Sequence, residues 1–186
     1  MNSRERVLAA VNHQAPDRVP IDLGGIRASG INAVVYDQLK QRLGVCTPTK
    51  IHDTMQILAE VELEVAERLH VDVLPVDLAD AEWAGQPAAA GVPRELFCGL
   101  PVYFQPGTRL VVEPDGGWAL HSAGGGMLAR MPRNGYYFDF VRPTMTADGI
   151  DPDAFQPSST VPEAQLRALE ERSHVLHSGT DKALLG

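Results

Sequence analysis

Two aspartates at the ends of expected strands are the first residues in this sequence that point to chemistry. Asp22 lies in the apolar run 19–23, and Asp77 ends the apolar run 71–77. If both runs are parallel strands, the two carboxylates lie at the strand ends where catalytic groups gather in β/α proteins. A carboxylate in that position hydrogen-bonds a substrate or acts as a base; the alternative is that it caps the next helix or pairs with an arginine such as Arg27.

Three further side chains have suitable chemistry. Arg27 follows a pair of glycines and is able to bind an anionic group, or else to form a surface salt bridge. Histidine is the side chain whose ordinary pKa lies near neutral pH, so His52 is a candidate catalytic group, although a loop histidine with an ordinary hydrogen bond is the simpler interpretation. The aromatic rings of Trp83, Trp118 and the run NGYYFDF either line a pocket or pack in the core of a β-structure.

The sequence contains no recognisable metal set and no nucleophile motif. His174 and His177 are spaced i, i+3 on an expected helix, but that face is polar and we expect both to be solvated. The patterns HExxH, Ser-His-Asp, GxGxxG and GxxxxGK[ST] are absent. Cys46 and Cys98 are far apart and form no CxxC pair, which favours reduced thiols in the cytoplasm, each a small core residue.

Composition excludes several classes of protein. The 186 residues carry a net charge of -8 and no basic run, so nucleic acid is not an expected partner. Every apolar stretch is shorter than the roughly 20 residues that span a bilayer. The N-terminus has charges but no apolar core of a secretory signal. A hydrophobic content of 44% is sufficient for a packed core.

Helices and short strands alternate along most of the chain. Helix periodicity and capping signals mark four stretches, at 2–11, 31–43, 53–69 and 160–178. Short apolar runs predict strands at 19–23, at 71–77 and in the closing residues KALLG. Strands separated by helices favour parallel pairing with crossovers, so the sequence predicts an α/β architecture.

The middle of the chain has a different character. Residues from about 84 to 140 are rich in Gly and Pro, with three short β-prone runs separated by DGG and GGG. Such triplets are typical of hairpin turns, so this insert is predicted to be an antiparallel β-meander.

The count of elements predicts an incomplete barrel. Three parallel strands with their helices make less than half of a (β/α)₈ TIM barrel, which needs about 250 residues. We therefore expect residues 1–186 to be the N-terminal part of one TIM barrel domain, with the meander inserted after the second strand. An open third-strand edge would favour self-association or docking to a complementary half-barrel.

Three blocks of the sequence resemble the uroporphyrinogen decarboxylase superfamily. The blocks are SRERVLAAVNHQAPDRVPIDLGG, KIHDTMQILAEVELEVAERLHVDVLPVD and GGWALHSAGGGMLARMPRNGYYFD. The resemblance is closest to the methyltransferase-like branch, which comprises corrinoid-linked demethylases and methylcobalamin-dependent methyltransferases. It covers nearly the whole chain and implies the same TIM barrel.

The resemblance implies transfer of a methyl group between a methylated small molecule and a corrinoid (cobalamin) protein or a thiol. On this interpretation Asp77 and His52 are catalytic groups, and Asp22, Arg27 and Trp83 contact the substrate. The branch also typically binds zinc through one His and two Cys late in the barrel, so zinc and a corrinoid partner are implied for a complete protein. No zinc ligands are expected within these residues, and the fragment alone is expected to have low activity.

Two alternatives stay open. One is a decarboxylase (a lyase) acting on a tetrapyrrole, in which Asp77 binds the pyrrole N–H groups. Its substrate carries four carboxylates, whereas the loop LGGIRASG offers Arg27 as its one guanidinium. The other alternative is a non-catalytic half-barrel that works by docking to a partner chain.

Overall fold

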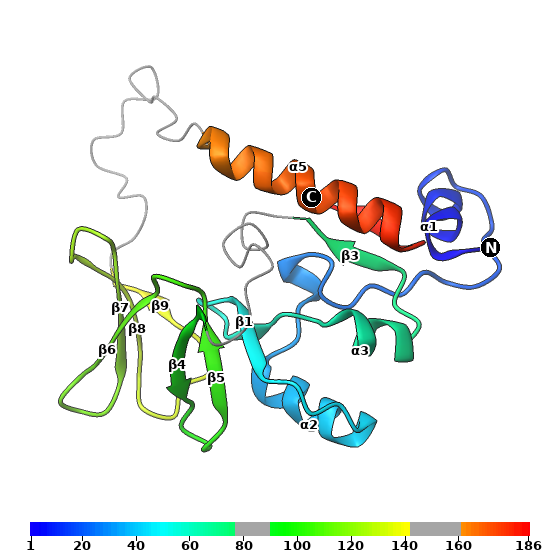
Figure 1. Ribbon diagram of the computed structural model, residues 1–186. Coiled ribbons are helices and arrows are strands. Elements are labelled where there is room, and N and C mark those ends of the chain that lie inside the picture. The colour runs from blue at the N-terminus through cyan, green and yellow to red at the C-terminus, as the bar shows by residue number, and fades with distance from the viewer. Residues whose placement is uncertain (77–89, 142–160) are drawn as a thin grey trace.

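The computed structural model describes residues 1–76, 90–141 and 161–186. Within these ranges the chain forms four α-helices and ten short strands (Figure 1). The helices are α1 (Ser3–Val11), α2 (Ala33–Leu43), α3 (Leu63–Arg68) and α5 (Glu163–Gly179), with a 3-10 turn η1 (Arg27–Ser29) before α2. The strands of the first half are β1 (Thr49–Asp53), β2 (Leu58–Ala59), β3 (Val73–Pro75), β4 (Val92–Glu95) and β5 (Pro101–Phe104). They are followed by β6 (Arg109–Val112), β7 (Trp118–His121), β8 (Met127–Met131), β9 (Asp139–Phe140) and β10 (Ala183–Leu185).

The predicted α/β fold, the N-terminal part of a (β/α)₈ TIM barrel with an inserted meander, is wrong. The strands form three separate small sheets, in the orders β2-β1-β5-β4, β10-β3 and β6-β7-β8-β9. Two pairings are parallel, β1 with β5 and β3 with β10, and the others are antiparallel. A barrel needs successive parallel strands in one closed sheet, and the described ranges hold no such sheet.

The main cause of the error lies between residues 49 and 69, where the sequence predicts one helix from Asp53. The structure has β1, a turn and β2 there, and only the six-residue α3 is helical. Asp53 Oδ1 accepts a hydrogen bond from Gln56 N at 2.8 Å and so closes the turn. The spacing that predicts a helix cap fits an Asx turn equally well, because both use a carboxylate to accept a nearby N–H.

The predicted strand at 19–23 also fails to form. The backbone of Ile21 meets Asp72 in two ways: Asp72 N donates to Ile21 O, and Ile21 N donates to the carboxylate Oδ2, both at 2.8 Å. The Asp72 carboxylate thus accepts the hydrogen bond that a backbone carbonyl of a neighbouring strand would accept in a β-sheet. The segment stays irregular beside the start of β3.

The glycine-rich insert behaves as its turn signals indicate. β6, β7 and β8 pair antiparallel, and the two predicted turns lie between them. Gly116 and Gly125 have φ of 82° and 85°, a left-handed conformation that glycine adopts without strain. The preceding hairpin β4-β5 joins the sheet of β1, since Thr49 pairs with Val102 in parallel. The insert therefore shares a sheet with the first half of the chain.

One main core connects these parts. It includes Tyr36 of α2, Ile51 of β1 and Phe104 of β5, all fully buried. Trp118 of β7 packs against Phe97 and Phe104, with ring centroids 5.2 Å and 6.1 Å apart, and is 5% exposed. Trp118 is therefore a core residue and not a pocket wall.

A smaller core lies between α3, β3 and α5. Its buried members are Ala66, Val71, Leu74 and Leu176. Figure 1 shows α5 lying across β3, with α1 near the carboxyl end of α5. No helix in the described parts of the chain is long and apolar enough to cross a membrane.

A buried ion network replaces the expected apolar stripe of α1. Asn2 and Glu5 form the predicted capping box, but the buried side of the helix is Ser3, Arg6 and Ala9. Arg6 and Arg18 both bind the fully buried Asp72: Arg6 Nη1 to Oδ1 and Arg18 Nη1 to Oδ2, each at 2.6 Å. Leu8 is 53% exposed instead of facing the core. The helix is thus held to β3 by charge as well as by packing.

Candidate functional site

Asp22 shapes the loop that carries two of the predicted site residues. Its Oδ1 accepts a hydrogen bond from Gly25 N at 2.8 Å, which closes a tight turn. Gly24 has φ of 81°, and a Cβ there would lie 2.8 Å from Val61 Cγ2. Only glycine fits this position without displacement, so the loop lies tightly against the segment before α3. Asp22 therefore acts as a turn-closing side chain, and no contact with Arg27 is formed.

Arg27 reaches from this loop to the end of β1. Its Nε lies 3.2 Å from Asp53 Oδ2. The Asp53 side chain is 4% exposed, whereas the Arg27 side chain is 64% exposed. Among the described residues no partner binds the terminal Nη1 and Nη2 atoms. The guanidinium is thus anchored at one edge and presents its other N–H groups to solvent.

His52 lies in β1, directly before Asp53. Its side chain is buried and its backbone oxygen accepts a hydrogen bond from Gln105 Nε2 at 2.8 Å. His52 is expected in a loop, but it lies in a central strand of the β2-β1-β5-β4 sheet. His52 thus directly precedes the ion-pair partner of Arg27 in β1.

The other predicted residues do not join this group. Asp77 and Trp83 lie outside the described residues. His174 and His177 are both exposed on α5, as expected of solvated side chains. Of the run NGYYFDF, Phe138 is buried in the core, whereas Tyr136 is 65% exposed and lines a small pocket. The site defined by the structure therefore consists of Arg27 with its anchor Asp53.

The partner of Arg27 is the residue that sequence reasoning missed. The sequence predicts a helix that begins at Asp53, and it suggests Asp22 as the acid that pairs with Arg27. The sequence of β1, TKIHD, shows no apolar–polar alternation that would have marked it as a strand, although four of its five positions are buried. A buried aspartate at the end of such a strand requires a cation or several N–H donors.

Zinc does not fit the residues that the structure describes. These parts of the chain contain no group of three or more His, Cys, Asp or Glu placed to hold a metal ion. Cys46 and Cys98 are free thiols, and both are exposed, so the prediction that they are core residues is wrong. No step of a reaction is assigned here to zinc.

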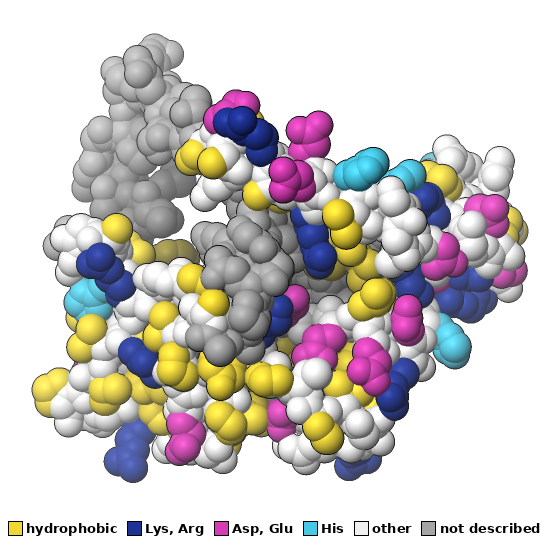
Figure 2. Space-filling model, viewed as in Figure 1, with side chains coloured by type: hydrophobic (Ala, Val, Ile, Leu, Met, Phe, Trp, Pro, Cys, Tyr) yellow, Lys and Arg dark blue, Asp and Glu magenta, His cyan; other side chains and the backbone are white. Residues whose placement is uncertain are grey.

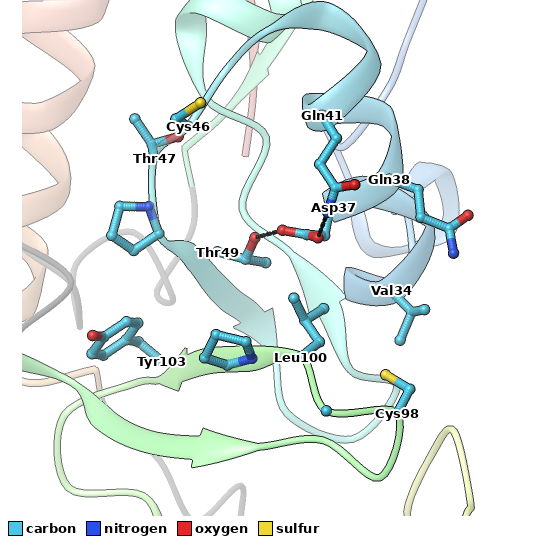
Figure 3. Close-up of a pocket in the computed structure, with 13 residues that line it drawn as sticks. Val34, Asp37, Gln38, Gln41, Cys46, Thr47, Thr49, Cys98, Leu100 and Tyr103 are labelled. Atoms are coloured by element: carbon cyan, nitrogen blue, oxygen red, sulfur yellow. Dashed lines mark hydrogen bonds between the residues drawn. The ribbon is translucent and has the colours of Figure 1, made fainter.

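The structure also contains a cleft beside α2 that the sequence does not predict. A cleft of 710 Å³ lies between α2, residues 46–49 and residues 98–103, and both cysteines line it (Figure 3). Its helix wall is formed by side chains spaced i, i+3, i+4 and i+7, namely Val34, Asp37, Gln38 and Gln41. The wall formed by residues 46–49 lies before the predicted helix at 53–69, in a stretch for which the sequence predicts no strand.

Surface composition differs between the two halves of the molecule. On the face shown in Figure 2, hydrophobic side chains gather over the strands, and charged side chains gather over the helices. In β6, Val111 and Val112 are 49% and 63% exposed.

Comparison with protein-family models, with curated proteins and with solved structures finds no match for this chain. The resemblance to the uroporphyrinogen decarboxylase superfamily therefore stands on the three sequence blocks. In chemical terms, the site around Arg27 is suited to binding an anion, because a guanidinium fork matches the geometry of a carboxylate or a phosphate.

Proposed function

We propose that this chain supplies the substrate-binding wall of a uroporphyrinogen decarboxylase-like methyltransferase in the cytoplasm. The reaction moves a methyl group between a methylated small molecule and a corrinoid protein or a thiol. The three sequence blocks support the family, and the two free thiols support a reducing compartment. His52 keeps its proposed catalytic role, and so do Asp77 as a catalytic group and Trp83 as a substrate contact, although these two lie outside the described residues.

The observation that carries the proposal is the unequal exposure of the Arg27–Asp53 pair. An ordinary surface salt bridge has two exposed partners and contributes little to stability. Here the acid is buried and the base is exposed, so Asp53 fixes the position of a guanidinium that faces solvent. A fixed guanidinium binds an anionic substrate with less loss of conformational freedom than a mobile one does.

The decarboxylase alternative has less support from the surroundings of Arg27. A substrate with four carboxylates requires several guanidinium groups. The two arginines that most closely precede Arg27, Arg18 and Arg6, are bound to Asp72, and Arg6 also to Asp17. Both guanidinium groups already have carboxylate partners, so Arg27 is the one guanidinium that its loop offers to a substrate carboxylate.

The proposal is tested by methyl transfer from methylcobalamin to two small thiols, mercaptoacetate and 2-mercaptoethanol. In each transfer the thiolate sulfur forms a bond to the methyl carbon and the cobalt keeps the electron pair of the broken bond. The loss of methylcobalamin absorbance under anaerobic conditions measures the rate. We expect a rate above the protein-free control with the wild-type chain, and a larger excess for the anionic mercaptoacetate.

Arg27→Gln is the decisive variant for the anion contact. It is expected to lower the mercaptoacetate rate by about fivefold, the effect of losing roughly 1 kcal/mol from an accessible ion pair. The 2-mercaptoethanol rate should change little, because that thiol carries no carboxylate. Arg109→Gln, on the distant β6, is the matched control. Equal effects of Arg27→Gln on both thiols would contradict the role of Arg27, and no transfer above background with either thiol would contradict methyl transfer itself.

A further inference from the structure

The cleft beside α2 adjoins a smaller side pocket, with which it shares lining residues. The cleft has a volume of 710 Å³ and the adjoining side pocket 150 Å³. Val34 and Cys98 line both of them, and Figure 3 shows these two side chains close together at one end of the cleft. Neither Arg27 nor Asp53 lines either hollow, so this site is separate from the one described above.

Among the described residues that line the cleft, the only charge is negative. Asp37 is its one charged side chain, and none of the described residues lining it is a Lys, Arg or His. Lys40, on the same helix, is 1% exposed and does not line the cleft: its Nζ lies behind the wall, where it donates to Thr47 O at 2.7 Å and to the Glu62 carboxylate at 3.2 Å, which balances its charge. A ligand in the cleft therefore meets a carboxylate that no lining cation neutralises, which favours a cation over an anion.

Asp37 is held in place and keeps accepting capacity. Gln41 Nε2 donates to Oδ2 at 2.7 Å, and Thr49 Oγ1 donates to Oδ1 at 3.3 Å (Figure 3). A carboxylate has about four lone-pair directions, so these two hydrogen bonds leave room for more donors. Thr49 is 2% exposed, which fixes one side of the carboxylate against the start of β1.

The side pocket has no charged lining residue among those described and is mainly apolar, with Asn32 and Asn134 as its amide side chains. Its walls include Ile57, Leu96, Phe97 and Met131, and Ile57 and Met131 are almost completely buried. An apolar cavity of about 150 Å³ is large enough to hold a benzene ring. Val34 and Asp37 are one helical turn apart, about 5–6 Å between Cβ atoms. The distance from the carboxylate to the pocket mouth is therefore that of a short linker in a small molecule.

We propose that the cleft and its side pocket bind a small organic cation, with an ammonium group at Asp37 and an aromatic or branched apolar group past Val34 and Cys98. The ammonium donates hydrogen bonds to the free lone pairs of the carboxylate. Transfer of the apolar group from water into the side pocket contributes the hydrophobic part of the binding free energy. This inference does not depend on the proposed methyl transfer.

The two thiols provide an internal test. Cys98 lies at the junction with the side pocket, and Cys46 lies at the other end of the cleft (Figure 3). The rates at which neutral iodoacetamide alkylates each thiol are measured by mass spectrometry with increasing benzylammonium. We expect Cys98 to be protected and Cys46 to be protected much less. Benzyl alcohol should require about fivefold more for equal protection, and benzoate should protect least, because both lack the ion pair.

Two variants separate charge from folding. Asp37→Asn should raise the benzylammonium concentration needed for half-protection by about fivefold. Gln38→Lys, at an exposed position, should raise it as well by adding a competing cation, and Asp115→Asn on the far hairpin should leave it unchanged. Protection by benzoate equal to that by benzylammonium, equal slowing of both thiols, or no protection of Cys98 by benzylammonium would each overturn the proposal.

Discussion

The molecule contains two arginine–aspartate clusters that differ in which partner faces water. At Asp72 the carboxylate is fully buried and the Arg6 side chain is 9% exposed, with Arg18 closing the cluster. At Asp53 the carboxylate is just as deeply buried, but the Arg27 side chain is 64% exposed. The same chemistry therefore serves two purposes: the first cluster joins α1, the segment after it and β3, and the second presents a cation to a ligand.

The largest expected effect comes from removing the charge of Asp72. Asp72→Asn leaves Arg6 and Arg18 with a neutral partner in a buried position, and breaking such a pair typically costs about 3–5 kcal/mol. We expect the free energy of unfolding, measured by denaturant titration, to fall by about that amount. Loss of the docked position of α1 should accompany it.

The control for Asp72→Asn is Asp115→Asn. Asp115 also pairs with an arginine, Arg130, but its side chain is 57% exposed. Its removal should change the unfolding free energy far less. If the two variants are equally stable, the buried network does not hold α1 and β3 together.

The unfolding free energy should also depend on pH through Asp72. Burial raises the pKa of this carboxyl, but hydrogen bonds from Arg18, the Ile21 N–H, Ser3 and Arg6 outweigh it and lower the pKa from 3.8 to about 2. Because the folded-state pKa is the lower one, the contribution is complete above pH 3.8 and is lost as the pH falls toward 2.

This pH dependence has a direct measurement. Denaturant titrations between pH 5 and pH 2 should show a steep loss of stability for the wild type and a shallower loss for Asp72→Asn. Equal slopes for the two proteins would show that other carboxylates dominate. Asp17 also contributes in the same direction, because its hydrogen bond with Arg6 lowers its pKa.

The smallest expected effect belongs to Arg27. Arg27→Lys keeps a cation for the buried Asp53 but loses the planar fork. We expect it to change stability by less than about 1 kcal/mol, since the arginine is mostly exposed. Arg27→Gln should destabilise slightly more, because Asp53 then keeps only its hydrogen bond from Gln56 N among those described. A loss as large as that of Asp72→Asn would remove the distinction between the two clusters.

Local signals in the sequence predict many of the elements correctly. The capping box at Asn2 and Glu5, the left-handed Gly44 after α2, and the strand in KALLG all appear in the structure. Each depends on contacts within a few residues, which periodicity and turn chemistry capture. The sheet arrangement depends on distant pairings, and these are not visible in local patterns.

The candidate site could be predicted only in part for the same reason. Arg27 stands out in the sequence because it follows two glycines, but its partner Asp53 is 26 positions away in sequence. The spacing of Asp53 and Gln56 fits a helix cap and an Asx turn equally well, and only the buried strand before it decides for the turn. The cleft beside α2 forms only when β1 and residues 98–103 pack beside the helix, so no local sequence pattern reveals it.

Arg27 differs from the buried Arg6 in its exposure, and labelling with phenylglyoxal tests this difference most directly. The reagent modifies accessible guanidinium groups, and mass spectrometry reports each site. We predict rapid modification of Arg27, slow modification of Arg6, and slowing at Arg27 when mercaptoacetate is added. Modification of Arg6 as fast as that of Arg27, or no slowing at Arg27 by the anion, would contradict the central claim.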